Sequence, residues 1–144
     1  MTELQWPEWP DADRPVVELS DDECWARLEE ERVGRLGYQL VDEIHVVPIN
    51  YAVADRTLLL RTAAGNKLLA AELHAEVALE IDRFGPDDAW SVLVRGGLQH
   101  LEEDEAERLG ELGDWTWVPT LKYDLVRVVP TAVTGRHFFL RADH

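Results

Sequence analysis

From residue 33 onward the spacing of apolar side chains changes from a helical period to a period of two, and this change constrains the fold most. Segments 33–40, 44–53 and 57–62 each have this strand-like pattern, and short polar turns at Asp42-Glu43 and Asp55-Arg56 separate them. Successive side chains of a strand point to opposite faces, so such alternation is typical of half-buried strands. We therefore expect three antiparallel strands joined by tight turns.

A short helix is expected before the first strand. Ser20 and Glu23 have the spacing of a capping box, and Leu19 stands where it can pack back on the helix. Asp21 and Asp22 suit the first turn, where carboxylates interact favourably with the helix dipole. The pattern predicts a helix from Ser20 to about Glu31.

Further strands are predicted at 76–82, 89–101 and 123–129, the last continuing past Pro130 over 133–140. Short helices are predicted at 66–73 and 104–112. Gly96-Gly97 lies inside a long strand and indicates a bend or a β-bulge. Six antiparallel strands with only short helices between them favour a small closed or split barrel over a parallel βαβ sheet.

The chain has 144 residues, which favours one domain. Trp6-Pro7 and Trp9-Pro10 forbid regular structure in residues 1–15, which we interpret as an extended arm before a domain spanning 16–144. The arm is either a frayed tail or a strap that packs on the domain or on a partner subunit. The net charge of −15 argues against binding nucleic acid or anionic membrane surfaces. Neither a membrane span nor a signal region is recognisable, so we expect a cytoplasmic protein.

A local basic segment stands out against this acidity. Residues 56–71 contain Arg56, Arg61 and Lys67 and no acidic residue, in a chain with 29 Asp+Glu and 14 Lys+Arg. The predicted strand ends at Arg61-Thr62, and Gly65-Asn66-Lys67 then opens a predicted helix. Helix N-termini and basic side chains both bind phosphate. The segment therefore favours a phosphate site, although an ordinary turn with solvated charges has the same pattern.

Common catalytic motifs are not recognisable in the chain. The five histidines lack the HExxH spacing, and we expect no metal site. Ser91 lacks the G-x-S-x-G context of a nucleophile, and Cys24 lies beside acidic residues that would raise its pKa. Neither a G-x-G-x-x-G nor a P-loop is present. If the protein is an enzyme, a cofactor is expected to supply the chemistry.

The motifs GRLG, VPINY, RTAAGNK, VALEID, WSVLVRG and VTGR occur in this order over residues 33–136. Together they resemble the pyridoxamine 5′-phosphate oxidase-like family of flavin-binding split barrels. The resemblance implies a mainly β (α+β) fold, a six-stranded antiparallel Greek-key split β-barrel with short flanking helices. It also implies a homodimer that holds FMN between its subunits.

The resemblance also implies roles for single residues. The strand along the flavin ring would be Val47, Pro48, Ile49 and Asn50, whose backbone groups would meet the polar edge of the ring. The phosphate would be bound by Arg61, Thr62, Asn66 and Lys67. Ser91 would face the flavin, and Arg136 would reach the site, with either subunit as its source. Three tryptophans either line the ring pocket or belong to the core, namely Trp90, Trp115 and Trp117.

The chain departs from the oxidase itself. It lacks the full basic and aromatic set for a second phosphate, and Gly135-Arg136-His137 is only a fragment of the oxidase's C-terminal signature. We therefore expect an FMN-dependent oxidoreductase that transfers hydride to a small organic acceptor other than pyridoxamine phosphate. The alternatives are a deazaflavin cofactor, a non-catalytic flavin, deazaflavin or haem binding module of the same fold, and a structural dimer with an empty groove.

Overall fold

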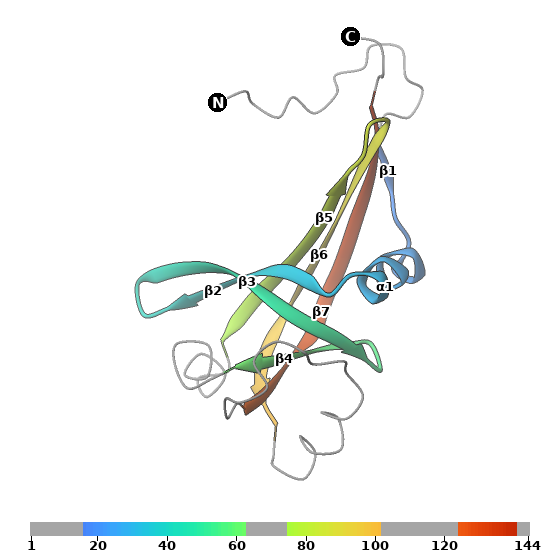
Figure 1. Ribbon diagram of the computed structural model, residues 1–144. Coiled ribbons are helices and arrows are strands. Elements are labelled where there is room, and N and C mark those ends of the chain that lie inside the picture. Colours follow the sequence, from blue (N-terminus) through green and yellow to red (C-terminus); the bar gives the residue numbers. More distant parts are fainter. Residues whose placement is uncertain (1–15, 63–74, 102–123, 141–144) are drawn as a thin grey trace.

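A computed structural model describes residues 16–62, 75–101 and 124–140, which form one antiparallel sheet and one helix (Figure 1). The elements in chain order are β1 (Val16–Glu18), α1 (Asp21–Glu30), β2 (Val33–Leu40), β3 (Glu43–Ala54), β4 (Thr57–Thr62), β5 (Glu76–Phe84), β6 (Asp88–His100) and β7 (Asp124–Phe139). The strand-like patterns of the sequence all correspond to strands of this sheet.

The sheet closes into a six-stranded barrel. The strand order is β1-β7-β4-β3-β2-β5-β6, and an additional β6–β7 pairing closes strands β2 to β7 into a ring that leaves β1 outside. Strand β5 returns to lie beside β2, which gives the order β5-β2-β3-β4 of a Greek key. The predicted fold is therefore confirmed. Strand β1 is a seventh strand on the outside of β7, and its three residues were too few to show a period.

Helix α1 begins where the sequence predicted. The Ser20 hydroxyl accepts a hydrogen bond from the Glu23 N–H at 3.2 Å, and the Glu23 carboxylate accepts one from the Ser20 N–H at 2.8 Å. The helix ends one residue before the predicted Glu31. It packs beside the barrel through buried Cys24, Trp25 and Leu28 (Figure 1), and the Tyr51 hydroxyl donates to the Leu28 carbonyl at 2.8 Å.

The barrel interior is aliphatic. Side chains from every strand of the barrel are almost completely buried there, which is where burial of apolar surface contributes most to stability. The most deeply buried aliphatic ones are Leu36, Leu58, Leu60, Leu79, Ile81, Val92, Val94, Leu98, Val126 and Val128, and β3 adds Ile49 and Tyr51. This interior leaves only the outward-facing side chains of the strands for binding.

The first hairpin turn differs from the prediction by one residue. Strand β3 already begins at Glu43, opposite Leu40, so the turn is Val41-Asp42 and not Asp42-Glu43. Val41 has φ 58°, which is rare for a β-branched residue. The sequence therefore contains no indication that Val41 belongs to the turn. The predicted turn Asp55-Arg56 is confirmed, with φ 51° and 55° as a type I′ hairpin requires.

The predicted irregularity at Gly96-Gly97 is confirmed as a register shift between Arg95 and Gly96 where β6 crosses β7. A Cβ atom at Gly96 would lie 2.1 Å from the Val129 carbonyl oxygen, so only glycine fits this crossing. Strand β7 continues through Pro130 as expected. At Gly97, in contrast, an added Cβ atom would meet nothing within 4 Å.

Several predictions lie outside the described residues: the arm 1–15, the helices at 66–73 and 104–112, and Trp115 and Trp117. In the part of the chain that the structure describes, no helix is both long and apolar enough to span a membrane.

Candidate functional site

The outer face of the barrel, which points away from the aliphatic interior, carries most of the polar side chains predicted for the site. Register partners in an antiparallel pair lie on the same face. Ser91 on β6 is opposite both Asp82 on β5 and Arg136 on β7, and Arg136 is opposite Glu18 on β1. These residues therefore form one row across four strands of the outer face.

The predicted flavin-strand residues on β3 divide between the two faces. Ile49 is buried in the core and Val47 packs against it, so neither side chain is available on the outer face. Pro48 and the half-buried Asn50 lie on the outer face. The backbone N–H and C=O groups of Val47 and Ile49 point toward β2, as those of Tyr51 do, so the expected backbone contacts with a ligand fall to Pro48 and Asn50.

The backbone of this part of β3 has an open edge. Residues 43–50 pair with β2, whereas only residues 51–54 pair with β4. The Tyr51 N–H donates a hydrogen bond to the Arg32 carbonyl at 2.9 Å, so the backbone groups of Tyr51 point toward β2. Backbone groups alternate in direction along a strand, so those of Pro48 and Asn50 point to the opposite side, away from β2. No described strand occupies that side, which explains how Pro48 is accommodated in the strand.

The described part of the basic segment ends beside Asn50. Tyr51 is opposite Leu60, and extending this register by one residue brings Asn50 next to Arg61. Arg61 is half-buried near the end of β4, and Thr62 follows it as the last residue of the strand, opposite Asp124. Asn66 and Lys67 lie outside the described residues. The structure thus brings together Asn50 and Arg61 at one place and Ser91 and Arg136 at another.

Trp90 belongs to the core. It is 7% exposed, and the Arg27 guanidinium lies 4.9 Å from its ring centroid on the helix side of the sheet. Of the two predicted roles, lining a ring pocket or packing in the core, the structure supports the second for this residue.

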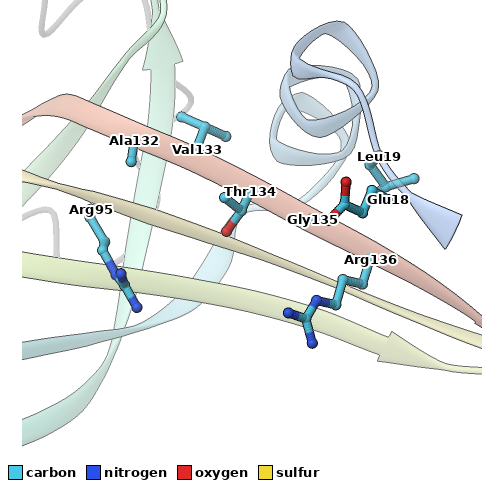
Figure 2. A pocket seen from close by; sticks show the side chains of 8 residues that line it. All are labelled: Glu18, Leu19, Arg95, Ala132, Val133, Thr134, Gly135 and Arg136. Atoms are coloured by element: carbon cyan, nitrogen blue, oxygen red, sulfur yellow. The ribbon is translucent and has the colours of Figure 1, made fainter. Parts of the chain in front are cut away.

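A pocket of about 350 Å³ lies where β1 meets β7 (Figure 2). Its polar side chains come from three strands, with Arg95 on β6, Thr134 and Arg136 on β7, and Glu18 on β1. We call Arg95, Thr134 and Arg136 the arginine pocket. The sequence analysis missed Arg95, although the alternation of WSVLVR puts it on the same face as Ser91 and could have identified it.

An ion-pair cluster lies between this pocket and β3. Arg35 on β2 contacts Glu80 at 2.5 Å and Asp82 at 3.2 Å, both on β5. Burial, and then the neighbouring Asp82, raise the pKa of Glu80 to about 7, although Arg35 acts to lower it. The charge of Arg35 is therefore already balanced within the fold.

His137, His45 and Cys24 have structural roles. His137 lies 2.8 Å from the Asp88 carboxylate and stacks on Phe139, while His45 stacks on Tyr38. Burial, and then the acidic residues Asp21 and Glu23, raise the pKa of Cys24, as the sequence predicted, and the thiol is completely buried. Residues 16–62, 75–101 and 124–140 contain no group of three side chains able to hold a metal ion.

Comparison with known proteins gives consistent results. Residues 20–137 match the pyridoxamine 5′-phosphate oxidase family. An uncharacterized protein of Mycobacterium tuberculosis is 42% identical over 87 residues, which is 60% of this chain and 79% of that protein. A Corynebacterium glutamicum protein, provisionally named a pyridoxamine 5′-phosphate oxidase, superposes with a TM-score of 0.80 at 35% identity, covering 90% of this chain and 98% of its own. The FAD binding protein of Mycobacterium smegmatis superposes with a TM-score of 0.73 at 34% identity, covering 86% and 99%.

Proposed function

The chain belongs to the pyridoxamine 5′-phosphate oxidase family, and we propose that it is an FMN-dependent oxidoreductase that acts on a small organic acceptor. The relative from Mycobacterium smegmatis binds FAD, which supports a flavin as the cofactor class. FMN is the simplest flavin that fits one phosphate site at the basic segment.

The observation that carries the proposal is the position of Asn50 and Arg61, each one residue beyond the last β3–β4 pair, Tyr51 and Leu60, where the open edge of β3 begins. A flavin has a ring with several hydrogen-bond acceptors and a phosphate group on a flexible chain. Amide and backbone groups at Asn50 suit the ring, and the Arg61 guanidinium suits the phosphate. The donors present therefore fit the cofactor.

In this proposal the bound flavin supplies the hydride chemistry, and the protein supplies binding and orientation. Arg61 and Thr62, with Asn66 and Lys67 beyond them in the sequence, hold the phosphate. Asn50 donates hydrogen bonds to the ring. Ser91, which lies on β6 away from Asn50, would reach the ring from the second copy of the chain. The open backbone edge of β3 adds donors and acceptors that need no side chain.

We further propose that two copies of the chain associate around this site. Val41, Ile44 and Val46, which we call the hairpin patch, are 83%, 75% and 66% exposed at the end of the β2–β3 hairpin. This hairpin extends away from the rest of the barrel (Figure 1). Neighbouring apolar side chains with such exposure are typical of an interaction surface. The open edge of β3 borders the patch, so a second copy would enclose the flavin site.

Fluorescence titration with FMN tests the phosphate assignment. Arg61→Ala and Lys67→Ala each remove a charge-assisted hydrogen bond worth about 1.5–3 kcal/mol, so FMN affinity should fall roughly 10- to 100-fold. Arg83→Ala is the control, because Arg83 forms an exposed ion pair with Glu31 and is not among the residues proposed to hold the flavin. Unchanged affinity in both test variants would refute the assignment.

Turnover separates the enzyme from a binding module that holds a flavin, a deazaflavin or haem. The loaded protein should reduce an added acceptor faster than the same concentration of free FMN, with a nicotinamide nucleotide as donor. A rate equal to that of free FMN, across a panel of acceptors, would favour the binding module.

A further inference from the structure

We propose that the arginine pocket is a second anion site, separate from the phosphate site at Arg61, and that it binds the phosphate or carboxylate groups of an acidic ligand. The inference deepens the proposed function, on which it depends only for the identity of that ligand. Its own basis is the charge and shape of the pocket.

The charges of Arg95 and Arg136 are not balanced by the described residues. Three other exposed arginines have carboxylate partners: Arg35 with Glu80 and Asp82, Arg56 with Asp22, and Arg83 with Glu31. Neither Arg95 nor Arg136 forms an ion pair or a side-chain hydrogen bond within residues 16–62, 75–101 and 124–140. In a chain with 29 Asp+Glu and 14 Lys+Arg, two such arginines lining one pocket indicate that an external anion is the partner.

The geometry suits a ligand with two acidic groups. Arg136 is opposite Ser91, four residues before Arg95 on β6, so the two arginines are separated by roughly 13 Å along the strand. In Figure 2 their side chains lean toward one another, and the Thr134 hydroxyl lies between them on the same side. This arrangement offers two forked donors and one hydroxyl to a diphosphate or a dicarboxylate.

The backbone leaves room for such a ligand. Strand β4 pairs with β7 as far as Val128, and β1 pairs with it from Arg136 onward, so no described strand covers that edge between them. The bulge at Arg95 and Gly96 lies across from this uncovered stretch.

Glu18 is the one carboxylate among the residues that line the pocket. Although it is the register partner of Arg136, no ion pair joins the two side chains. The described lining therefore carries two positive charges and one negative charge, and it remains net positive.

Calorimetric titration of the full, flavin-free protein with inorganic pyrophosphate tests the site. We expect saturable binding that weakens at least 10-fold in Arg95→Gln and again in Arg136→Gln. Arg83→Gln is the matched control, because it removes one arginine charge from a paired position. Thermal melting verifies that each variant is folded. Absence of saturable binding, or affinities unchanged in the Arg95→Gln protein, would overturn the proposal.

Two further titrations distinguish the sources of the anion. If the diphosphate of FAD occupies the pocket, FAD should bind at least 10-fold more tightly than FMN, and Arg95→Gln should remove this preference. If an acidic substrate occupies it, the FMN-loaded protein should still bind pyrophosphate. Displacement of pyrophosphate by FMN would contradict a second site. Flavin retention is followed separately by visible absorption, so failure of the proposed flavin function is distinguishable from failure of the pocket.

Discussion

The hairpin patch and the arginine pocket differ in what they leave exposed to solvent. The hairpin patch on β2 and β3 exposes Ile44 and Val46 at 75% and 66%. The pocket on β6 and β7 exposes two arginines that have no carboxylate partner among the residues that the structure describes. Exposed apolar surface is best covered by another apolar surface, whereas an unbalanced charge is best met by a counter-ion. The comparison therefore supports the proposals of protein association at the hairpin patch and of ligand binding at the arginine pocket.

The largest expected effect is on the free energy of unfolding, and it concerns the β6–β7 crossing beside the arginine pocket. Gly96→Ala places a Cβ atom 2.1 Å from the Val129 carbonyl oxygen, so one strand must move. We expect a loss of about 3 kcal/mol or more in the free energy of unfolding, measured with urea. Gly97→Ala, where the added Cβ meets nothing within 4 Å, should change it by less than about 1 kcal/mol. Equal losses in both variants would show that the crossing is not the constraint.

The next effect concerns association through the hairpin patch. Ile44→Asp with Val46→Asp replaces two exposed apolar side chains, each worth about 1.5–3 kcal/mol when buried, with charges. Sedimentation of the wild type should show a dimer, and the dissociation constant should rise at least about 100-fold in the variant. Arg95→Gln should remain dimeric. A dimer that survives the double substitution would place the interface elsewhere, and a monomeric wild type would remove the inter-subunit site.

The smallest expected effect is on the pH dependence of stability, and it concerns Glu80 on β5, between the hairpin patch and the arginine pocket. Its pKa is raised from 4.5 to about 7, so the folded protein binds this proton more tightly than the unfolded chain does. Unfolding therefore releases the proton between these pH values, and the free energy of unfolding falls as the pH rises from 4.5 toward 7. After allowance for solvent screening the fall is on the order of 1 kcal/mol.

Glu80→Gln should remove this part of the pH dependence, which urea unfolding at pH values below and above the titration would measure. Glu29→Gln, a substitution on the exposed face of α1, is the control and should retain the dependence. The same slope in the wild type and in Glu80→Gln would assign the titration to another group.

Local signals in the sequence predicted the elements well. The Ser20–Glu23 capping box fixed the start of α1, and the two-residue period fixed β2, β3 and β4 because both signals act over a few residues. The first turn was wrong by one residue because Val41 adopts a positive φ that its side chain disfavours. The strand pattern favoured a closed or split barrel, whereas the Greek-key order came from the family resemblance, because the long-range pairing of β5 with β2 has no local signal.

The candidate site was less predictable than the fold. The two-residue period of β3 puts Asn50 on the opposite face from Val47 and Ile49, but it could not show that the hairpin brings Asn50 and Arg61 to adjoining positions beyond the Tyr51–Leu60 pair. Arg95 was missed because a carboxylate that balances an arginine can lie far away in the sequence. Arg35 pairs with Glu80, which is 45 residues away in the sequence, whereas Arg95 has no carboxylate partner among the described residues. The sequence around the two arginines does not reveal this difference.

Flavin retention by the wild-type protein tests the central claim most directly. The purified protein is incubated with excess FMN, passed through a desalting column and examined by visible absorption, with a parallel sample incubated with FAD. The account predicts that one of the two flavins stays bound, close to one molecule per chain, and that Arg61→Ala loses it. A colourless wild-type protein after both incubations would contradict the account.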